Sequence, residues 1–168
     1  MKAILSVDTK WGIGCKNSLL ERIPEDMRFF RRMTLGKVVV MGRETFDSLP
    51  GREPLKDRIN IVVSTNRSLN RQGITVCDSL TELFNELAKY PQEDVFVIGG
   101  ASLYRQLLPY CSEVYITKFH KAYEADRYFP NLDMDEAWMP EVLDEYLSFN
   151  NLEYSRVKYA NNKIVQFT

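Results

Sequence analysis

Apolar and polar positions along the chain follow two alternating patterns. Short runs of apolar, β-branched residues recur between segments whose apolar positions repeat every three or four residues. This alternation predicts an α/β fold, in which helices connect the strands of a sheet. The predicted strands cover residues 2–8, 37–42, 58–63, 74–77, 94–98 and 112–119, and the predicted helices cover residues 24–35, 43–49, 79–90 and 100–108.

The last part of the chain predicts a different arrangement. Asn161 and Asn162 divide the segment 153–167, and such a pair can adopt the positive φ angles of a tight hairpin turn. We therefore expect the chain to end in two antiparallel strands, so the sheet is not purely parallel. Loops are predicted at residues 50–54, 66–73 and 133–140, where Gly, Pro, Asn and charged residues gather.

Length and composition narrow the class of protein. The 168 residues are 45% hydrophobic, which suits a single domain over residues 1–168 with one core. The formal net charge of −1 argues against general electrostatic binding to nucleic acid or to an anionic membrane. No stretch approaches the ~20 apolar residues that cross a bilayer, and the first residues do not resemble a secretory leader. We therefore expect a cytoplasmic protein that does not bind nucleic acid or membranes.

Cysteine and histidine usage argues against a metal cofactor. Cys15, Cys77 and Cys111 are odd in number and widely spaced, which fits neither a disulfide framework nor a Cys-x-x-Cys metal site. His120 is the only histidine, so zinc sites that need several histidines are excluded. We expect three reduced thiols and no metal.

The segment Ile-Pro-Glu-Asp-Met-Arg-Phe-Phe at residues 23–30 places a carboxylate in the first turn of a predicted helix. Pro24 suits the first helical position, and an acidic residue suits the positive end of the helix dipole. Asp26 also shares a helix face with Phe29 and Phe30, three and four positions away. Two interpretations follow: Asp26 only stabilises the helix start, or it handles a proton beside a flat ligand.

Further motifs favour the second interpretation. They are, in chain order, AILSVDTKWGIG (3–14), KVVVMGRETF (37–46), PLKDRIN (54–60), VFVIGGASLY (95–104), YIT (115–117) and DRYFP (126–130). Over nearly the whole length they resemble the landmarks of bacterial-type dihydrofolate reductases. The resemblance implies an α/β, single-domain fold with an eight-stranded, mostly parallel twisted sheet, an antiparallel C-terminal strand and about four flanking helices.

The same resemblance implies an activity. It is the reduction of 7,8-dihydrofolate to 5,6,7,8-tetrahydrofolate, with NADPH as hydride donor to pterin C6 and a proton delivered to N5. This reaction supports one-carbon and thymidylate metabolism. The resemblance also implies that antifolate inhibitors bind, and we expect a monomer.

The implied NADPH site does not use the standard dinucleotide motif, because Asn17 stands where Gly-x-Gly-x-x-Gly has its last glycine. Instead, the strand-to-helix turns at 41–45 and 98–101 are predicted to offer backbone N–H groups to a pyrophosphate. A cis peptide bond is implied between Gly99 and Gly100. The implied cofactor-binding residues are Ser6, Ile13, Gly14, Gly42, Arg43, Glu44, Thr45, Ser64, Thr65, Gly99, Gly100, Ala101, Ser102, Leu103 and Tyr104.

Arg43 matches the family's arginine for the adenosine 2′-phosphate, and Ser64 and Thr65 match its hydroxyl partners. A guanidinium with hydroxyls favours a phosphate over a bare hydroxyl. The chain departs from the family at Glu44, where many relatives have a basic residue. Arg67 is a candidate to compensate for that carboxylate, although an exposed arginine commonly has no such role.

On the substrate side, the resemblance makes Asp26 the catalytic carboxylate that binds the pterin, with Thr117 fixing its orientation. We expect Asp26 to be the only ionisable group buried in the pterin slot. Arg58 is implied to pair with the substrate's α-carboxylate. A second departure is Glu21, which stands where many relatives carry a tryptophan. The implied substrate-binding residues are Leu5, Ser6, Leu19, Met27, Phe30, Leu49, Arg58, Ile98, Tyr104 and Thr117.

Three alternatives stay open from the sequence alone. A related NADPH-dependent reductase of a pyrimidine intermediate would keep the cofactor motifs, but it gives no reason for Asp26, Phe30 and Arg58 to occur together. A non-catalytic nucleotide- or folate-binding module would not need an intact Asp26. A nucleic-acid-binding protein would need a basic aromatic patch, which the balanced charge does not supply.

Overall fold

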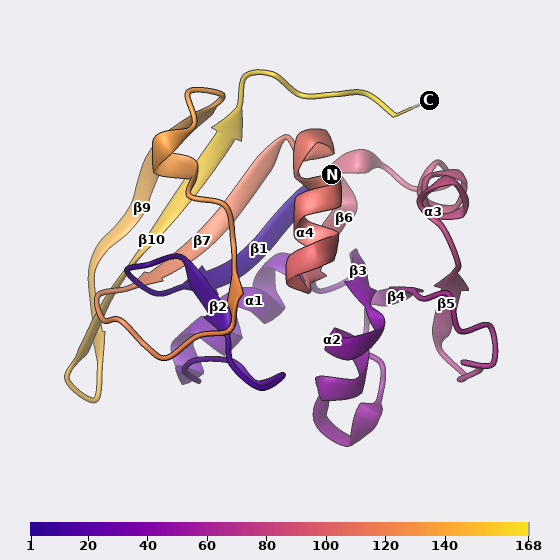
Figure 1. Cartoon of the computed structure of the whole chain (residues 1–168), viewed down its shortest axis with the longest axis horizontal. Coiled ribbons are helices and arrows are strands. Elements are labelled where there is room, and N and C mark those ends of the chain that lie inside the picture. The colour runs from indigo at the N-terminus through magenta and orange to yellow at the C-terminus, as the bar shows by residue number, and fades with distance from the viewer. Residues whose placement is uncertain (168) are drawn as a thin grey trace.

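An eight-stranded sheet runs through the molecule in the order β5-β4-β3-β6-β1-β7-β10-β9 (Figure 1). The structure is a computed structural model and describes residues 1–167. The strands of this sheet are β1 (Lys2–Val7), β3 (Val38–Gly42), β4 (Ile59–Val63), β5 (Ile74–Cys77), β6 (Val95–Gly99), β7 (Glu113–Phe119), β9 (Trp138–Phe149) and β10 (Leu152–Asn161). Two short strands, β2 (Gly12–Gly14) and β8 (Arg127–Tyr128), form a separate ribbon.

Four α-helices connect or flank these strands, and short 3-10 turns complete the chain. The helices are α1 (Pro24–Thr34), α2 (Arg43–Ser48), α3 (Leu80–Leu87) and α4 (Ala101–Leu107). The 3-10 turns are η1 (Pro50–Arg52), η2 (Gln92–Asp94), η3 (Leu108–Tyr110) and η4 (Leu132–Met134). The predicted strands and helices are confirmed, with ends that differ by a few residues.

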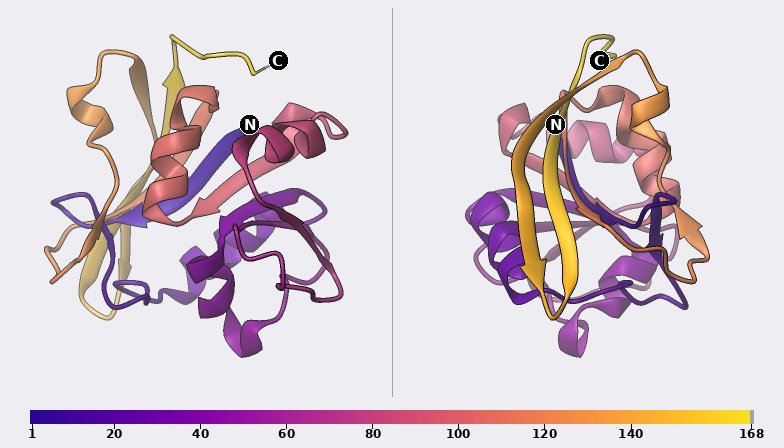
Figure 2. Two further views of the ribbon diagram at one scale, coloured as in Figure 1. Left: turned by 45° about the vertical axis from the view of Figure 1, so that its right-hand side comes forward. Right: turned by 90° about the vertical axis from the view of Figure 1, so that its left-hand side faces the viewer.

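Strand directions confirm the predicted mixed sheet. The pairs β1–β6, β1–β7, β3–β4, β3–β6 and β4–β5 are parallel, while β10 is antiparallel to both β7 and β9. The chain therefore changes from parallel winding to a long C-terminal hairpin, whose two strands lie side by side at the front of the right-hand view of Figure 2.

The predicted position of that hairpin turn was wrong. The turn is at Asn150 and Asn151, whose φ angles are +47° and +62°, and Asn161 ends β10. Both asparagine pairs carry the same turn signal, but only a turn at the earlier pair leaves two long strands that can pair with each other. The predicted loop at 133–140 was also partly wrong, since β9 begins at Trp138. Pro140 is compatible with β9 because β9 is an edge strand, where a missing N–H is tolerated.

The sheet is covered on both faces, and the alternation along β3 shows how. Val38 and Val40 are fully buried in the cluster that contains Leu83 of α3 and Leu107 of α4. The neighbouring β3 positions belong to a second cluster with Phe46 of α2. Because successive strand side chains point to opposite faces, the continuous Val run of β3 packs against helices on both sides.

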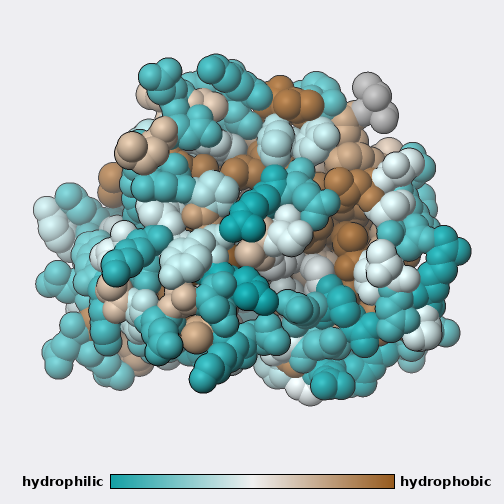
Figure 3. All heavy atoms as spheres, in the orientation of Figure 1, coloured by the Kyte–Doolittle hydropathy of each residue, from teal (hydrophilic) through white to brown (hydrophobic). Residues whose placement is uncertain are grey.

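The surface of the molecule is largely hydrophilic, with apolar side chains gathered in the hollow between α4 and α3 (Figure 3). No helix among residues 1–167 is both long and apolar enough to cross a membrane.

Candidate active site

Asp26 lies in the first turn of α1, two residues after Pro24 at the helix start. Its side chain is 14% exposed and its hydrogen bonds go to the sheet rather than to the N–H groups of α1. The adjacent Glu25 points the other way and pairs with Arg28 and Arg32 on the exposed side of the helix. The two neighbouring acids therefore have different environments, and only Asp26 faces the interior.

A row of four side chains crosses the sheet beneath Asp26. Ser6 of β1 is the register partner of Thr117 of β7, which is the partner of Arg156 of β10, which is the partner of Asp144 of β9. We call these four residues the cross-strand row. Because these four residues are register partners on adjacent strands, two hydroxyls, a cation and an acid lie side by side across the sheet.

Three members of the cross-strand row contact the carboxylate directly. The Thr117 hydroxyl donates to Oδ1 of Asp26 at 2.6 Å, and the Ser6 hydroxyl donates to Oδ2 at 3.0 Å. Arg156 Nη2 lies 3.4 Å from Oδ1. Groups from the sheet therefore hold both carboxylate oxygens. A ligand would compete most directly with the Ser6 hydroxyl, which can rotate to another partner.

Arg156 corrects the expectation that Asp26 is the only ionisable group buried at this place. The Arg156 side chain is 4% exposed, pairs with Asp26 and with Asp144, and lies with its guanidinium carbon 3.8 Å from the centre of the Phe29 ring. No local motif marks this arginine in the sequence. Its position depends on the pairing of β10 with β7, which becomes visible only in the folded sheet.

The apolar residues expected to form the slot come from five separate segments. Leu5 is on β1, Ile98 is on β6, Met27 and Phe30 are on α1, Leu49 follows α2, and Leu19 is in the loop after β2. Leu19 is 52% exposed and Met27 is 43% exposed, whereas the other four are partly buried. Leu19 and Met27 are thus available to cover a flat ligand. When no ligand is bound, their apolar surface is exposed to water.

Arg58 is held at the start of β4 by a polar turn. The Asn60 side chain, which is buried, bonds the backbone of Leu55 and the carbonyl of Arg58. Arg58 Nη1 donates to Thr34 Oγ1 at 3.3 Å, while its buried Nε has no hydrogen-bond partner among residues 1–167. Burial and then the positive charge of Arg31 lower the pKa of Arg58. Both observations mark a place where an anion would be stabilised.

The two glycine turns expected for a cofactor lie against each other. A Cβ placed on Gly42 would meet the amide nitrogen of Gly100 at 3.7 Å, and a Cβ on Gly99 would meet Thr45 Oγ1 at 3.2 Å. The Gly99–Gly100 peptide bond is cis, as expected, and Gly99 has φ +128°. Tyr104 of α4 is 5% exposed and its hydroxyl donates to the Ile4 carbonyl. The two turns therefore form a close-packed cradle, in which Thr45 and Tyr104 leave little room for a side chain at Gly99.

The remaining expected cofactor residues come from three other segments. Ile13 and Gly14 belong to β2, Ser64 and Thr65 follow β4, and Ala101, Ser102 and Leu103 form the first turn of α4. Ala101 and Leu103 are buried, whereas Ser102 is exposed.

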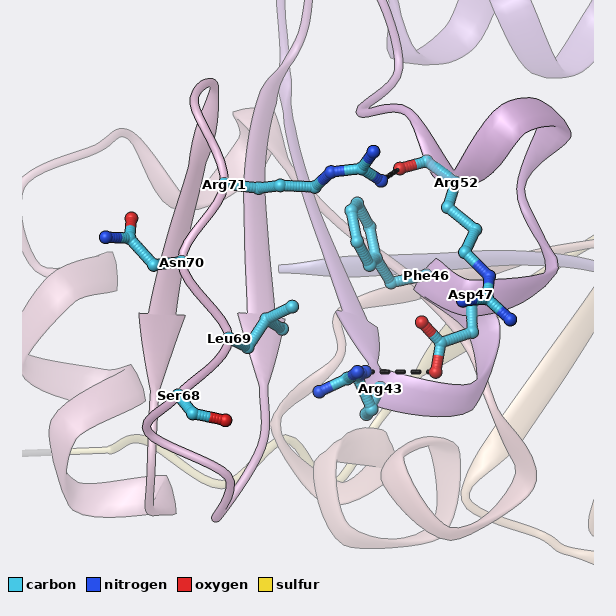
Figure 4. A pocket seen from close by; sticks show the side chains of 8 residues that line it. All are labelled: Arg43, Phe46, Asp47, Arg52, Ser68, Leu69, Asn70 and Arg71. Atoms are coloured by element: carbon cyan, nitrogen blue, oxygen red, sulfur yellow. Dashed lines mark hydrogen bonds and ion pairs between the residues drawn. The ribbon is translucent and has the colours of Figure 1, made fainter.

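Arg43 and Glu44 open helix α2 but face different surroundings. Arg43 Nε donates to Asp47 Oδ2 at 3.0 Å, within a pocket of about 290 Å³ between α2 and the loop at 68–71 (Figure 4). Glu44 is exposed and lines a neighbouring pocket with Asn17 of the loop after β2. Neither pocket is lined by Asp26.

Arg67, the candidate to compensate for Glu44, is engaged with another acid. Its side chain is 83% exposed and pairs with Asp78, ahead of α3. The second departure, Glu21, accepts a hydrogen bond of 3.0 Å from the Tyr123 hydroxyl. Burial and the neighbouring Glu21 raise the pKa of Tyr123 to about 12, so the phenol remains a donor at neutral pH. Glu21 thus fastens the loop after β2 to the segment before β8.

The fold and the site together define a class of protein. The glycine turns expected to bind a nucleotide follow Gly42 and Gly99, at the carboxyl ends of the parallel strands β3 and β6, which is where open α/β sheets bind nucleotides. Within this class, residues 1–160 match the sequence profile of the family described as Dihydrofolate reductase. The chain belongs to the dihydrofolate reductase family.

Individual relatives agree with the family match. The chain is 42% identical over 130 residues to a dihydrofolate reductase of Bacillus subtilis, covering 77% of this chain and 75% of the relative. It is 37% identical over 150 residues to a dihydrofolate reductase of Schistosoma mansoni, covering 81% of each. The solved dihydrofolate reductase of Enterococcus faecalis, complexed with NADP(H) and RAB-propyl, superposes with a TM-score of 0.84 at 30% identity. That comparison covers 96% of this chain and 95% of the other.

Proposed function

We infer that this chain reduces 7,8-dihydrofolate to 5,6,7,8-tetrahydrofolate with NADPH. The observation that carries this inference is the largely buried Asp26 carboxylate, which accepts hydrogen bonds from Ser6 and Thr117 on two central strands. The chain also belongs to the dihydrofolate reductase family. A pterin offers adjacent N–H donors that a fixed carboxylate can accept in pairs. The cofactor supplies the hydride when it is bound, and the protein supplies orientation and a route for the proton.

We propose that the Asp26 carboxylate orients the pterin and links its ring to the proton that the reaction consumes. Thr117 holds Oδ1 from below, so the carboxylate cannot rotate freely. The Ser6 hydroxyl, which donates to Oδ2, turns aside when the pterin donors arrive. Leu5, Phe30 and Ile98 then exclude water from the ring.

We propose that Arg58 binds the α-carboxylate of the substrate's glutamate tail. Support comes from its unpaired buried Nε and from the Asn60 turn that holds its backbone. An arginine fixed in this way offers a planar fork to a carboxylate.

We propose that NADPH lies along the cradle of Gly42, Gly99 and Gly100, with Arg43 near the 2′-phosphate. The close approach of the Gly42 turn to the Gly100 backbone amide supports this place for the pyrophosphate, and the NADP(H) complex of the Enterococcus faecalis relative supports the choice of cofactor. Arg43 would exchange its partner Asp47 for the phosphate. Ile13 and Gly14 of β2 and Tyr104 are proposed to surround the nicotinamide.

We further propose that residues 1–168 act as one domain, as a monomer in the cytoplasm, and that antifolates compete for the Asp26 site. The sheet that carries the cross-strand row runs through the whole chain, so one copy supplies every group of the row. Three free cysteines suit a reducing compartment.

The test is the loss of NADPH absorbance with dihydrofolate as substrate, in the wild type and in Asp26→Asn. A pyrimidine reductase substrate serves as the competing assay. We expect turnover with dihydrofolate only, and its loss in the variant. Turnover of the pyrimidine substrate alone would overturn the proposal.

A further inference from the structure

Arg156 is a charged group in a place where charge is costly. Its side chain is 4% exposed, and its Nε has no hydrogen-bond partner among residues 1–167. Burying a guanidinium costs several kcal/mol unless acids or aromatic faces compensate. Here the compensation comes from Asp26, Asp144 and the ring of Phe29.

The two acids that share Arg156 differ in their exposure. Asp26 is 14% exposed and lies 3.4 Å from Nη2, while Asp144 is 46% exposed and lies 3.0 Å from Nη1. Among residues 1–167 these are the two acidic partners within ion-pair distance of Arg156. The arginine therefore connects the buried carboxylate to a half-exposed acid on the edge strand.

We infer that Arg156 is a positioning residue that sets the pH range of the reaction, because its positive charge lies 3.4 Å from the Asp26 carboxylate and fixes that carboxylate in one orientation. The inference rests on the proposed function. A nearby positive charge favours the carboxylate over the protonated acid. Arg156 and the Thr117 hydroxyl share Oδ1, so Oδ2 remains the oxygen that turns toward a ligand.

Other charged groups near Asp26 do not provide the same effect. On its own helix, Glu25 is paired with Arg28 and Arg32 on the exposed side. From β10 the Tyr154 phenol also approaches, and burial keeps it neutral by raising its pKa. Strands β1 and β7 contribute the hydroxyls of the cross-strand row. Arg156 is thus the buried cation that acts on Asp26 from the sheet.

The sign of the effect follows from the proton that the reaction consumes. Hydride transfer should slow as pH rises through the point at which the site gives up its proton. Replacing Arg156 by an uncharged residue removes the group that favours the charged carboxylate, so the site keeps its proton to higher pH. Replacing Asp144 removes the acid that partly neutralises Arg156, so the site loses its proton at lower pH.

The experiment is single-turnover hydride transfer from NADPH to dihydrofolate, measured from pH 5 to 10 by stopped flow. In Arg156→Met we expect the midpoint of the pH profile to rise by roughly 1–2 pH units, the scale for one close charge. Arg156→Lys keeps the charge and should restore the greater part of that shift. Asp144→Asn should move the midpoint down, by less because Asp144 is half exposed.

Two controls separate this role from a merely structural one. Lys158→Met removes a cation from the same strand, paired with Glu141 rather than Asp26, and should leave the midpoint unchanged. In an Asp26→Asn background, Arg156→Met should shift the profile by no more than roughly a few tenths of a pH unit, because the mediating carboxylate is gone.

The inference is overturned if Arg156→Met and Asp144→Asn both leave the midpoint in place, or if the Arg156→Met shift persists in full without Asp26. Circular dichroism shows whether Arg156→Met folds. If it does not fold, Arg156→Lys and Asp144→Asn test the inference in its place, and an unchanged midpoint in Asp144→Asn then overturns the inference. A wild type that never oxidises NADPH with dihydrofolate would instead refute the proposed function.

Discussion

Ser6 and Thr117 are direct partners in the parallel register of β1 and β7, and their hydroxyls donate to opposite oxygens of Asp26. The carboxylate comes from a helix 20 residues from Ser6 and 91 residues from Thr117. Because strand register fixes both donors, the orientation of Asp26 is a property of the sheet. A one-residue slip between β1 and β7 would turn one hydroxyl to the other face.

Asp26→Asn should lower the turnover of dihydrofolate by about 10²–10⁴, the usual scale of a general acid–base contribution. The amide keeps the shape of the side chain but cannot carry the proton link. Steady-state kinetics measure the loss, and fluorescence titration should show nearly unchanged NADPH affinity. Glu25→Gln is the matched control, since this neighbouring acid faces solvent. Near-wild-type turnover in Asp26→Asn would reduce Asp26 to a helix-start residue.

Arg58→Leu should weaken dihydrofolate binding by about 2–4 kcal/mol, as expected when one partner of a close charge pair is removed. The leucine fills part of the space, so the turn around Asn60 should remain folded. A pterin without the glutamate tail should bind both proteins alike. Equal losses for the two ligands, measured by calorimetry, would show that Arg58 acts on the fold and not on the tail.

The order of strands and helices was accessible from the sequence because its signals are local. The Val run of β3 and the three- and four-residue spacing of α3 identify an element without knowledge of its neighbours. The C-terminal hairpin was misplaced for the same reason, since Asn150–Asn151 and Asn161–Asn162 carry equal local turn signals. Only the pairing of β9 with β10 distinguishes them.

The residues of the site show the same contrast between local signals and long-range pairing. Asp26 and Arg58 are identified by the family resemblance, and the structure places Asp26 on α1 against β1 and β7 and Arg58 just before β4. Arg156 was missed because its contact with Asp26 spans 130 residues and depends on the register of β10 against β7. An arginine is also mostly exposed in proteins, so nothing in the local pattern suggested burial.

Arg43→Ala should reduce the preference for NADPH over NADH by roughly 1–3 kcal/mol, the range of a charge-assisted contact. Loss of the Asp47 pair should cost little stability, because that pair is half exposed. Michaelis constants for both cofactors test this, with Arg67→Ala as the control, since Arg67 is exposed and pairs with Asp78. Unchanged selectivity in Arg43→Ala would remove Arg43 from the phosphate site.

The three thiols should differ sharply in reactivity, because the thiolate is the nucleophile. Burial, followed by the nearby charges of Glu82 and Glu86, raises the pKa of Cys77 to about 11. Burial likewise raises the pKa of Cys111 to about 12. Cys15 lies partly exposed in the loop after β2.

At pH 8 we therefore expect iodoacetamide to modify the native protein once, at Cys15, as read by intact mass and peptide mapping. Cys15→Ser should remain unmodified under the same conditions, and all three wild-type thiols should react in denaturant. Raising the pH toward 10 should speed labelling of Cys77 roughly tenfold per unit, since its thiolate fraction grows in that proportion below its pKa. Labelling of Cys77 as fast as Cys15 at pH 8 would contradict the burial of β5 against α3.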